Sequence, residues 1–170
     1  MRRRTVLAGG GATFTTLLGG CFSADTLVDD SPSLPPGLSV TTEHVVWDVL
    51  PDSRDRRERL YDGGTVHRLF TERENATRAI SAPNLPASFL DETDFDESFV
   101  VVVQYGRQSA TWLELDRIER TDDGLDIVAR VAEPSGGYGD DLAIHSLLLR
   151  VTDPAGGVPE SLRATVVDDP

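Results

Sequence analysis

The chain has 170 residues, enough for about one domain and an appendage, and its 16 basic and 29 acidic side chains give a formal net charge of −13. Every basic residue is an arginine, and the acidic excess excludes a protein that binds nucleic acid through its phosphates, because such binding needs a basic patch. The single cysteine excludes both a disulfide framework and a cysteine-rich zinc site.

The acidity has two interpretations. One is an ordinary solvated surface, and the other is adaptation to high salt, where the self-repulsion of like charges is screened over short distances. The absence of lysine and the excess of 19 aspartates over 10 glutamates favour a halophilic acidic protein.

The first 20 residues have the pattern of an export signal. Residues 6–18 carry no charge, but this stretch is shorter than the roughly 20 residues that span a bilayer, and it is rich in glycine and threonine. Arg3 and Arg4, followed by Thr-Val-Leu at residues 5–7, resemble the twin-arginine signal of halophilic archaeal type, whose cargo crosses the membrane already folded.

The end of this signal, Leu18-Gly19-Gly20-Cys21, resembles a lipobox. Small residues before the cut let the backbone enter a narrow peptidase site, and the cysteine thiolate accepts the lipid. The alternative is a lone cysteine buried by chance. The position of this only cysteine behind an arginine pair favours the lipobox, so we predict a palmitate-type lipid anchor on Cys21 that holds the protein on the outer face of the cell membrane.

Residues 21–39 are predicted to be a disordered linker, and residues 40–170 a single β-rich domain. The linker is rich in proline, aspartate and serine and shows no sustained period. Prolines disfavour both helix and sheet, and they keep such a tether extended.

The domain is predicted to be mainly β (α+β minor), a compact antiparallel sheet or sandwich of about six to seven strands with about one short helix. The expected strands cover residues 44–50, 65–70, 99–103, 113–118, 125–131, 144–151 and 162–166. A capping box formed by Thr71 and Glu74 predicts the helix, which should end near Ile80. The dense charge run at 53–60 is expected to be a solvated loop or edge.

Three local patterns predict specific features of this fold. The run Phe-Val-Val-Val-Val at 99–103 predicts a strand buried on both faces. Leu115 and Ile118 fall on opposite faces of their strand unless a bulge intervenes. Asp123-Gly124 predicts a hairpin between this strand and the next one.

The order of these elements resembles the C-terminal domain family of PrcB. The resemblance covers roughly residues 65–153: a short helix, the segment Asp-Phe-Asp-Glu-Ser-Phe at 94–99, the valine strand with Gly106, the Asp-Gly hairpin, and Glu-Pro-Ser-Gly-Gly at 133–137. It implies a domain carried on a lipoprotein subunit that stabilises a surface protease complex, and it implies no catalytic residue.

Residue types that carry chemistry are scattered along the chain. His44, His67 and His145 fall on three expected strands at no recognised ligand spacing, so we expect no metal and no cofactor. Gly-x-Ser-x-Gly is absent, and the acid pairs are attributed to the solvated surface. Asn75 begins the sequon Asn-Ala-Thr, which makes it a candidate glycosylation site on an exported chain.

A partner-binding surface is predicted at one end of the hairpin. The loops before and after it should be neighbours, because the start of the first strand and the end of the second lie together. They contain Tyr105, Arg107, Trp112 and Tyr138, which are residue types enriched at interface hot spots. The alternative is that Trp112 covers the core and Tyr138 fills a turn.

These observations favour a membrane-tethered extracytoplasmic lipoprotein with a non-catalytic interaction or scaffold domain. Its partners would be the membrane, through the lipid on Cys21, and an unknown envelope protein. The alternative is a small exported hydrolase whose site forms only in three dimensions.

Substitution of Cys21 by serine tests the anchor. Because a hydroxyl does not accept the lipid, we expect Cys21→Ser to give a soluble or unprocessed protein, measured by partition between the membrane and soluble fractions. The same extraction behaviour as the unmodified chain would contradict the lipid anchor.

Overall fold

The computed structural model describes residues 31–133 and 141–168. The residues of the predicted export signal and lipobox, and Tyr138, lie outside these ranges. The elements, in chain order, are β1 (Ser39–Val45), α1 (Arg54–Tyr61), β2 (Val66–Phe70), α2 (Arg73–Ala79), α3 (Ala87–Asp91), β3 (Ser98–Gln108), β4 (Trp112–Thr121), β5 (Gly124–Ala132), β6 (Leu142–Thr152) and β7 (Ser161–Val167). No helix in the described ranges is long and apolar enough to cross a membrane.

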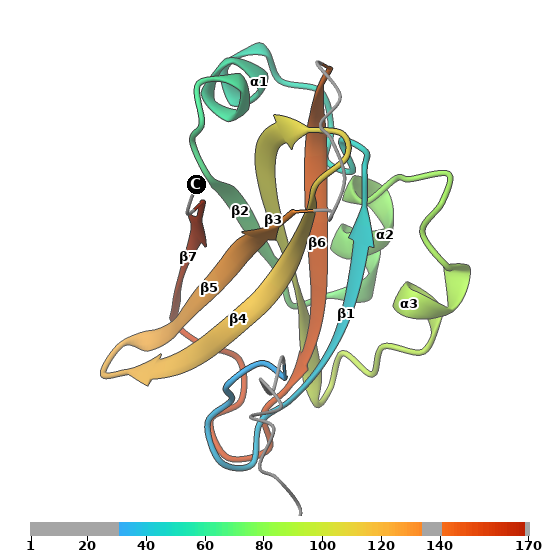
Figure 1. The fold of residues 1–170 in the computed structure, drawn as a ribbon. Helices are drawn as coiled ribbons and strands as arrows, with labels where there is room; N and C mark the ends of the chain where they lie inside the picture. The colour runs from blue at the N-terminus through green and yellow to red at the C-terminus, as the bar shows by residue number, and fades with distance from the viewer. Residues whose placement is uncertain (1–30, 134–140, 169–170) are drawn as a thin grey trace, which may run out of the picture. The chain divides into compact units, whose positions relative to one another are not determined.

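The strands form two sheets, which confirms the mainly β prediction (Figure 1). The larger sheet has the order β1-β6-β3-β2 and is antiparallel throughout. The smaller has the order β4-β5-β7, in which β5 and β7 run parallel. That parallel pair arises because the chain leaves β5, crosses through β6 in the other sheet, and returns in the original direction.

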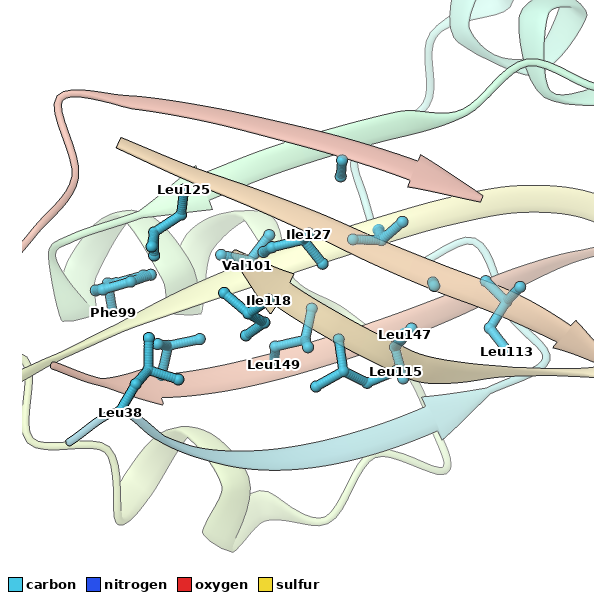
Figure 2. Close-up of a cluster of buried hydrophobic side chains, with 14 of the residues drawn as sticks. Leu38, Phe99, Val101, Leu113, Leu115, Ile118, Leu125, Ile127, Leu147 and Leu149 are labelled. Atoms are coloured by element: carbon cyan, nitrogen blue, oxygen red, sulfur yellow. The ribbon is translucent and has the colours of Figure 1, made fainter. Parts of the chain in front are cut away.

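The main core lies between the two sheets (Figure 2). Phe99 and Val101 on β3 and Leu149 on β6 face Leu115 on β4 and Ile127 on β5, and each of these five side chains is buried. Burial of apolar surface of this kind contributes about 25 cal/mol per Å² to stability, so the sheets hold each other chiefly through this layer.

A second core covers the outer face of the larger sheet. Val100 and Val102 on β3 and Leu148 on β6 pack there against Ile80, after α2, and Phe89 in α3. The valine run of β3 is therefore buried on both faces, as its sequence predicts.

The β4–β5 hairpin confirms two further patterns. The register shifts between Leu115 and Arg117, and this irregularity turns Leu115 and Ile118 toward the same core. The turn lies one position earlier than predicted, because Thr121 pairs with Gly124. A Cβ on Gly124 would lie 2.0 Å from the carbonyl oxygen of Ser161, so glycine is required where β7 begins beside the hairpin.

The charge run at 53–60 is a helix rather than a loop. Arginine and glutamate are good helix formers. Asp55 in the first turn and Arg59 in the last turn also interact favourably with the helix dipole. α1 buries only Leu60, so it lacks the apolar period that identifies most helices in a sequence.

α2 confirms the predicted helix and its end, because it spans Arg73–Ala79 with Ile80 as its C-cap. The Thr71–Glu74 capping box does not form, because the start of the helix has no side-chain cap and Glu74 pairs with Arg78 instead. α3 is a third helix where about one was expected, and its five residues are too few to show a period.

The domain begins earlier than predicted. Ser33 forms a β-bridge with Arg117, Leu38 is buried in the main core, and β1 starts at Ser39. Residues 31–39 of the predicted linker therefore belong to the domain, and residues 46–50 of the predicted first strand leave the sheet. Short prolyl segments that lie against a sheet edge have no periodic signature in the sequence.

Candidate functional site

Two of the predicted partner-binding residues are used inside the domain. The hydroxyl of Tyr105 donates a hydrogen bond to Asp168 at 3.1 Å, and Arg107 forms an ion pair with the same carboxylate at 3.1 Å. Burial and the neighbouring Asp168 raise the pKa of the Tyr105 phenol. Asp168 follows β7, so these contacts tie the smaller sheet to β3 of the larger one.

Trp112 has a different partner. Its neighbour Leu113 faces the core, which turns Trp112 to the outer face of the smaller sheet, where its indole N–H donates to Glu114 at 2.6 Å. The loops beside the hairpin do meet, because the Ser109 hydroxyl donates to Asp141 at 2.7 Å. Tyr138, the fourth residue of the predicted surface, falls outside the described ranges.

The candidate glycosylation site Asn75 is exposed on α2. Its side-chain amide donates to Glu72 at 2.8 Å and accepts from Arg78 at 3.4 Å. The sequon therefore lies on a solvent-facing helix surface.

A different surface feature, which we call the aromatic hollow, gathers exposed aromatic side chains. It is a depression of about 310 Å³ lined by Val46, Trp47, Asp48, Arg57, Tyr61 and Ile144. The Trp47 and Tyr61 side chains are 51% and 49% exposed, respectively. The hollow thus combines apolar walls with one carboxylate and one guanidinium.

The floor of the aromatic hollow rests on a buried polar network. The Arg56 guanidinium donates to both carboxylate oxygens of Asp48, at 2.6 and 3.1 Å, and to the Gln104 side-chain oxygen at 2.8 Å. The Gln104 amide in turn donates to Asp48 and to the Ser146 hydroxyl, which donates to the backbone oxygen of Trp47 at 2.6 Å. The network therefore reaches Trp47 through its backbone oxygen.

The network keeps Asp48 ionised. Burial opposes ionisation of this carboxyl, but the hydrogen bonds from Arg56 and Gln104 outweigh burial and hold its pKa below the usual value. Arg57 adds an ion pair to Asp48 at 3.5 Å and another to Asp52 at 3.1 Å. The hollow therefore has a fixed negative group beneath it and a half-exposed arginine at its rim.

Close backbone packing places α1 beside the hollow. A Cβ on Gly106 of β3 would lie 2.4 Å from the carbonyl oxygen of Leu60, so the absence of a side chain at Gly106 lets the helix rest directly on the strand. This approach brings Tyr61 over the sheet, where it faces the segment that contains Trp47.

No local pattern in the sequence predicts the aromatic hollow. Trp47 falls in a predicted strand, Tyr61 follows a charge run that was expected to be a loop, and Ile144 is more than eighty residues further along the chain. The available signal was the pair of aromatic residues flanking an arginine-rich segment of an otherwise acidic chain.

Two of the three histidines form a stacked pair. The rings of His44 and His145 are 5.3 Å apart and nearly parallel, and His44 Nε2 lies 3.1 Å from His145 Nδ1. His145 Nε2 lies 2.9 Å from the backbone oxygen of Gln108, so it carries the proton and His44 donates to Nδ1. His67 lies elsewhere, 3.1 Å from the Leu162 oxygen. Within the described ranges, no three potential metal ligands come together.

A second depression, of about 410 Å³, lies beside the β4–β5 turn. Its most buried charge is Asp153, which accepts two hydrogen bonds from Arg120, at 2.5 and 2.7 Å, and one from the Gly156 N–H at 2.9 Å. These bonds lower the pKa of Asp153 against the opposing effect of burial. Its carboxylate therefore serves to hold the loop after β6.

The aromatic hollow is the surface on which exposed aromatic residues and a rigid polar support coincide. Tyr105, Arg107 and Asp153, in contrast, are engaged in contacts within the domain. No family model, curated protein or solved structure matches the chain.

The histidine pair predicts a loss of stability in mild acid. Burial and the neighbouring His145 lower the pKa of His44 from 6.5 to about 4, so between these values the unfolded chain binds a proton that the folded chain excludes. Stability should therefore be full above about pH 6.5 and should fall toward about pH 4, by on the order of 1–3 kcal/mol.

Denaturant unfolding at pH 7.5 and at pH 5 measures this effect. We expect His44→Gln to reduce the loss on acidification, because an amide can donate to His145 without titrating, whereas the control His67→Gln should keep it. An equal loss in both variants would contradict the assignment to the pair.

Proposed function

We propose that this protein is a membrane-tethered lipoprotein, anchored through Cys21 on the outer face of the cell, whose domain binds and stabilises another envelope protein without catalysing a reaction. The aromatic hollow is the observation that carries the proposal. Tryptophan, tyrosine and arginine dominate the binding energy of protein interfaces, and Trp47, Tyr61 and Arg57 meet there.

Leaving these two rings in contact with water is unfavourable in free energy, and a bound partner would bury them. About half of each aromatic side chain faces solvent, although aromatic surface is favourably buried. Clustered apolar surface at the rim of a depression, in contrast to scattered single residues, is typical of an interaction site.

The charge around the hollow also suits association. Residues 46–64 contain four arginines and five acidic residues, a net charge of −1, whereas the whole chain carries −13. An acidic partner would meet less repulsion on this face than on the rest of the domain.

The support beneath the hollow would make binding efficient. Trp47 is held through its own backbone oxygen by Ser146, and Arg57 is held by two carboxylates. The Arg57 side chain and the backbone at Trp47, which these contacts already order, lose less conformational entropy when a partner binds. Binding to the folded form of a partner then stabilises that partner by mass action, which is what a scaffold does.

The resemblance to the PrcB C-terminal domain family supports the same role. In that family the domain belongs to a subunit that stabilises a surface protease complex. The lipobox at Leu18-Gly19-Gly20-Cys21 would place the domain on the membrane surface, where such a partner is found.

Alanine substitution of the two aromatic residues tests the proposal. We expect Trp47→Ala and Tyr61→Ala each to lower recovery of cross-linked envelope partner from membranes in molar KCl by about tenfold, the effect of a hot-spot residue worth about 1.4 kcal/mol. Melting temperatures should change little, because both side chains are half exposed.

Trp112→Ala is the matched control, since this tryptophan is also exposed but lies on the outer face of the smaller sheet. It should leave recovery unchanged. Loss of partner with Trp112→Ala alone would move the recognition surface to the end of the hairpin, and no loss with any of the three variants would contradict both surfaces.

A further inference from the structure

The edge strands of the two sheets differ in whether other segments cover them. An edge strand presents unpaired backbone N–H and C=O groups, which pair with any extended chain, and proteins usually block them with charges, bulges or other segments. β4 is blocked by Ser33, whose N–H donates to the Asp116 oxygen at 3.0 Å and whose oxygen accepts from Ile118 at 2.9 Å. The register irregularity of β4 lies at the same place.

The edges of β2 and β7 block each other. The Val166 N–H on β7 donates to the Thr65 hydroxyl, just before β2, at 3.3 Å. His67 on β2 lies 3.1 Å from the Leu162 oxygen on β7. A third chain segment could not pair with either strand without displacing these contacts.

β1 lacks such devices in the described part of the chain. It is the terminal strand of the larger sheet and pairs with β6 over seven consecutive residues without a register shift (Figure 1). Its sequence, Ser-Val-Thr-Thr-Glu-His-Val, contains a single charged residue, Glu43, and four β-branched residues. Among the four sheet edges, this one remains suited to strand addition.

We propose that β1 is a dimerisation edge, where β1 of one copy pairs antiparallel with β1 of a second copy. The two four-stranded sheets would then join into one sheet of eight strands about a two-fold axis. Main-chain hydrogen bonds between the two copies provide the attraction, as in other cases of strand addition.

The sequence of β1 is compatible with antiparallel pairing to a second β1. The antiparallel register that pairs all seven residues is centred on Thr42, which faces Thr42 of the second copy. In this register Glu43 lies opposite Thr41, so the carboxylates do not face each other and the Thr41 hydroxyl can donate to Glu43. Val40 lies opposite His44, and both lie on the face of the sheet that carries Leu147 and Leu149.

The net charge sets the conditions for this association. The whole chain carries −13, and a copy cut before Cys21, as proposed, carries −16, because three arginines and no acidic residue precede that cysteine. Two copies therefore repel each other in dilute buffer, and molar salt shortens the range of that repulsion to about 3 Å. The dimer is therefore expected in molar KCl and should weaken on dilution of the salt.

Cysteine cross-linking at the two-fold axis tests the proposal on the full chain in isolated membranes. Directly opposite Cα atoms in an antiparallel pair are about 4.5–5.5 Å apart, within the span of a disulfide. We expect Thr42→Cys, oxidised with copper phenanthroline in molar KCl, to give a product of twice the chain mass on a non-reducing gel.

Thr41→Cys is the matched control. Thr41 is adjacent and equally exposed, but its own copies would lie diagonally, about 8 Å apart, which is too far for a disulfide. It should give at least about tenfold less product. The double variant Thr41→Cys with Glu43→Cys should restore cross-linking, because these two positions face each other across the axis.

Each outcome decides the proposal. Cross-linking by Thr42→Cys and by the double variant, but not by Thr41→Cys alone, supports it, provided that the melting temperatures match that of the unmodified chain. Equal products at positions 41 and 42 would indicate random collision. Absence of product from both Thr42→Cys and the double variant, or a product with the mass of a different partner, would likewise overturn the proposal.

Discussion

A single buried guanidinium connects the parts of the domain that shape the aromatic hollow. Arg56 of α1 forms two hydrogen bonds to Asp48, one to Gln104 of β3, and one each to the backbone oxygens of Leu50 and Pro51. The helix, the segment after β1 and the centre of the larger sheet are thereby fixed to one another. Without these bonds α1 would be held mainly by Leu60, which is its only buried residue.

The energetics of this ion pair explain why it determines geometry. Moving two charges out of water is costly, so a buried pair adds stability only when its geometry satisfies the remaining donors and acceptors. The Arg56 and Asp48 side chains are 11% and 14% exposed and their partners are all in place, whereas the Arg54–Glu58 pair on the same helix is largely in solvent. Removal of one buried partner leaves the other uncompensated, while exposed pairs contribute little.

The parts of this fold that the sequence predicts are those fixed by local pattern. The valine run at 99–103 required a strand buried on both faces, and the spacing of Leu115 and Ile118 required a bulge; both are present. α1 could not be read in the same way, because its stability comes from docking through Arg56 rather than from an apolar period. The aromatic hollow joins residues distant in sequence, and Tyr105, predicted at a binding surface, is instead taken up by a hydrogen bond within the domain.

The free energy of unfolding of two arginine variants, measured by denaturant titration in molar KCl, tests this account most directly. Arg54 and Arg56 are two residues apart on α1 and both form ion pairs, which makes Arg54→Ala a close control for Arg56→Ala. We predict that Arg56→Ala loses about 3 kcal/mol or more, because Asp48 keeps a buried charge without its main partner. Arg54→Ala should lose less than about 0.5 kcal/mol. Equal losses in the two variants would contradict the claim that the buried pair holds α1 and the aromatic hollow in place.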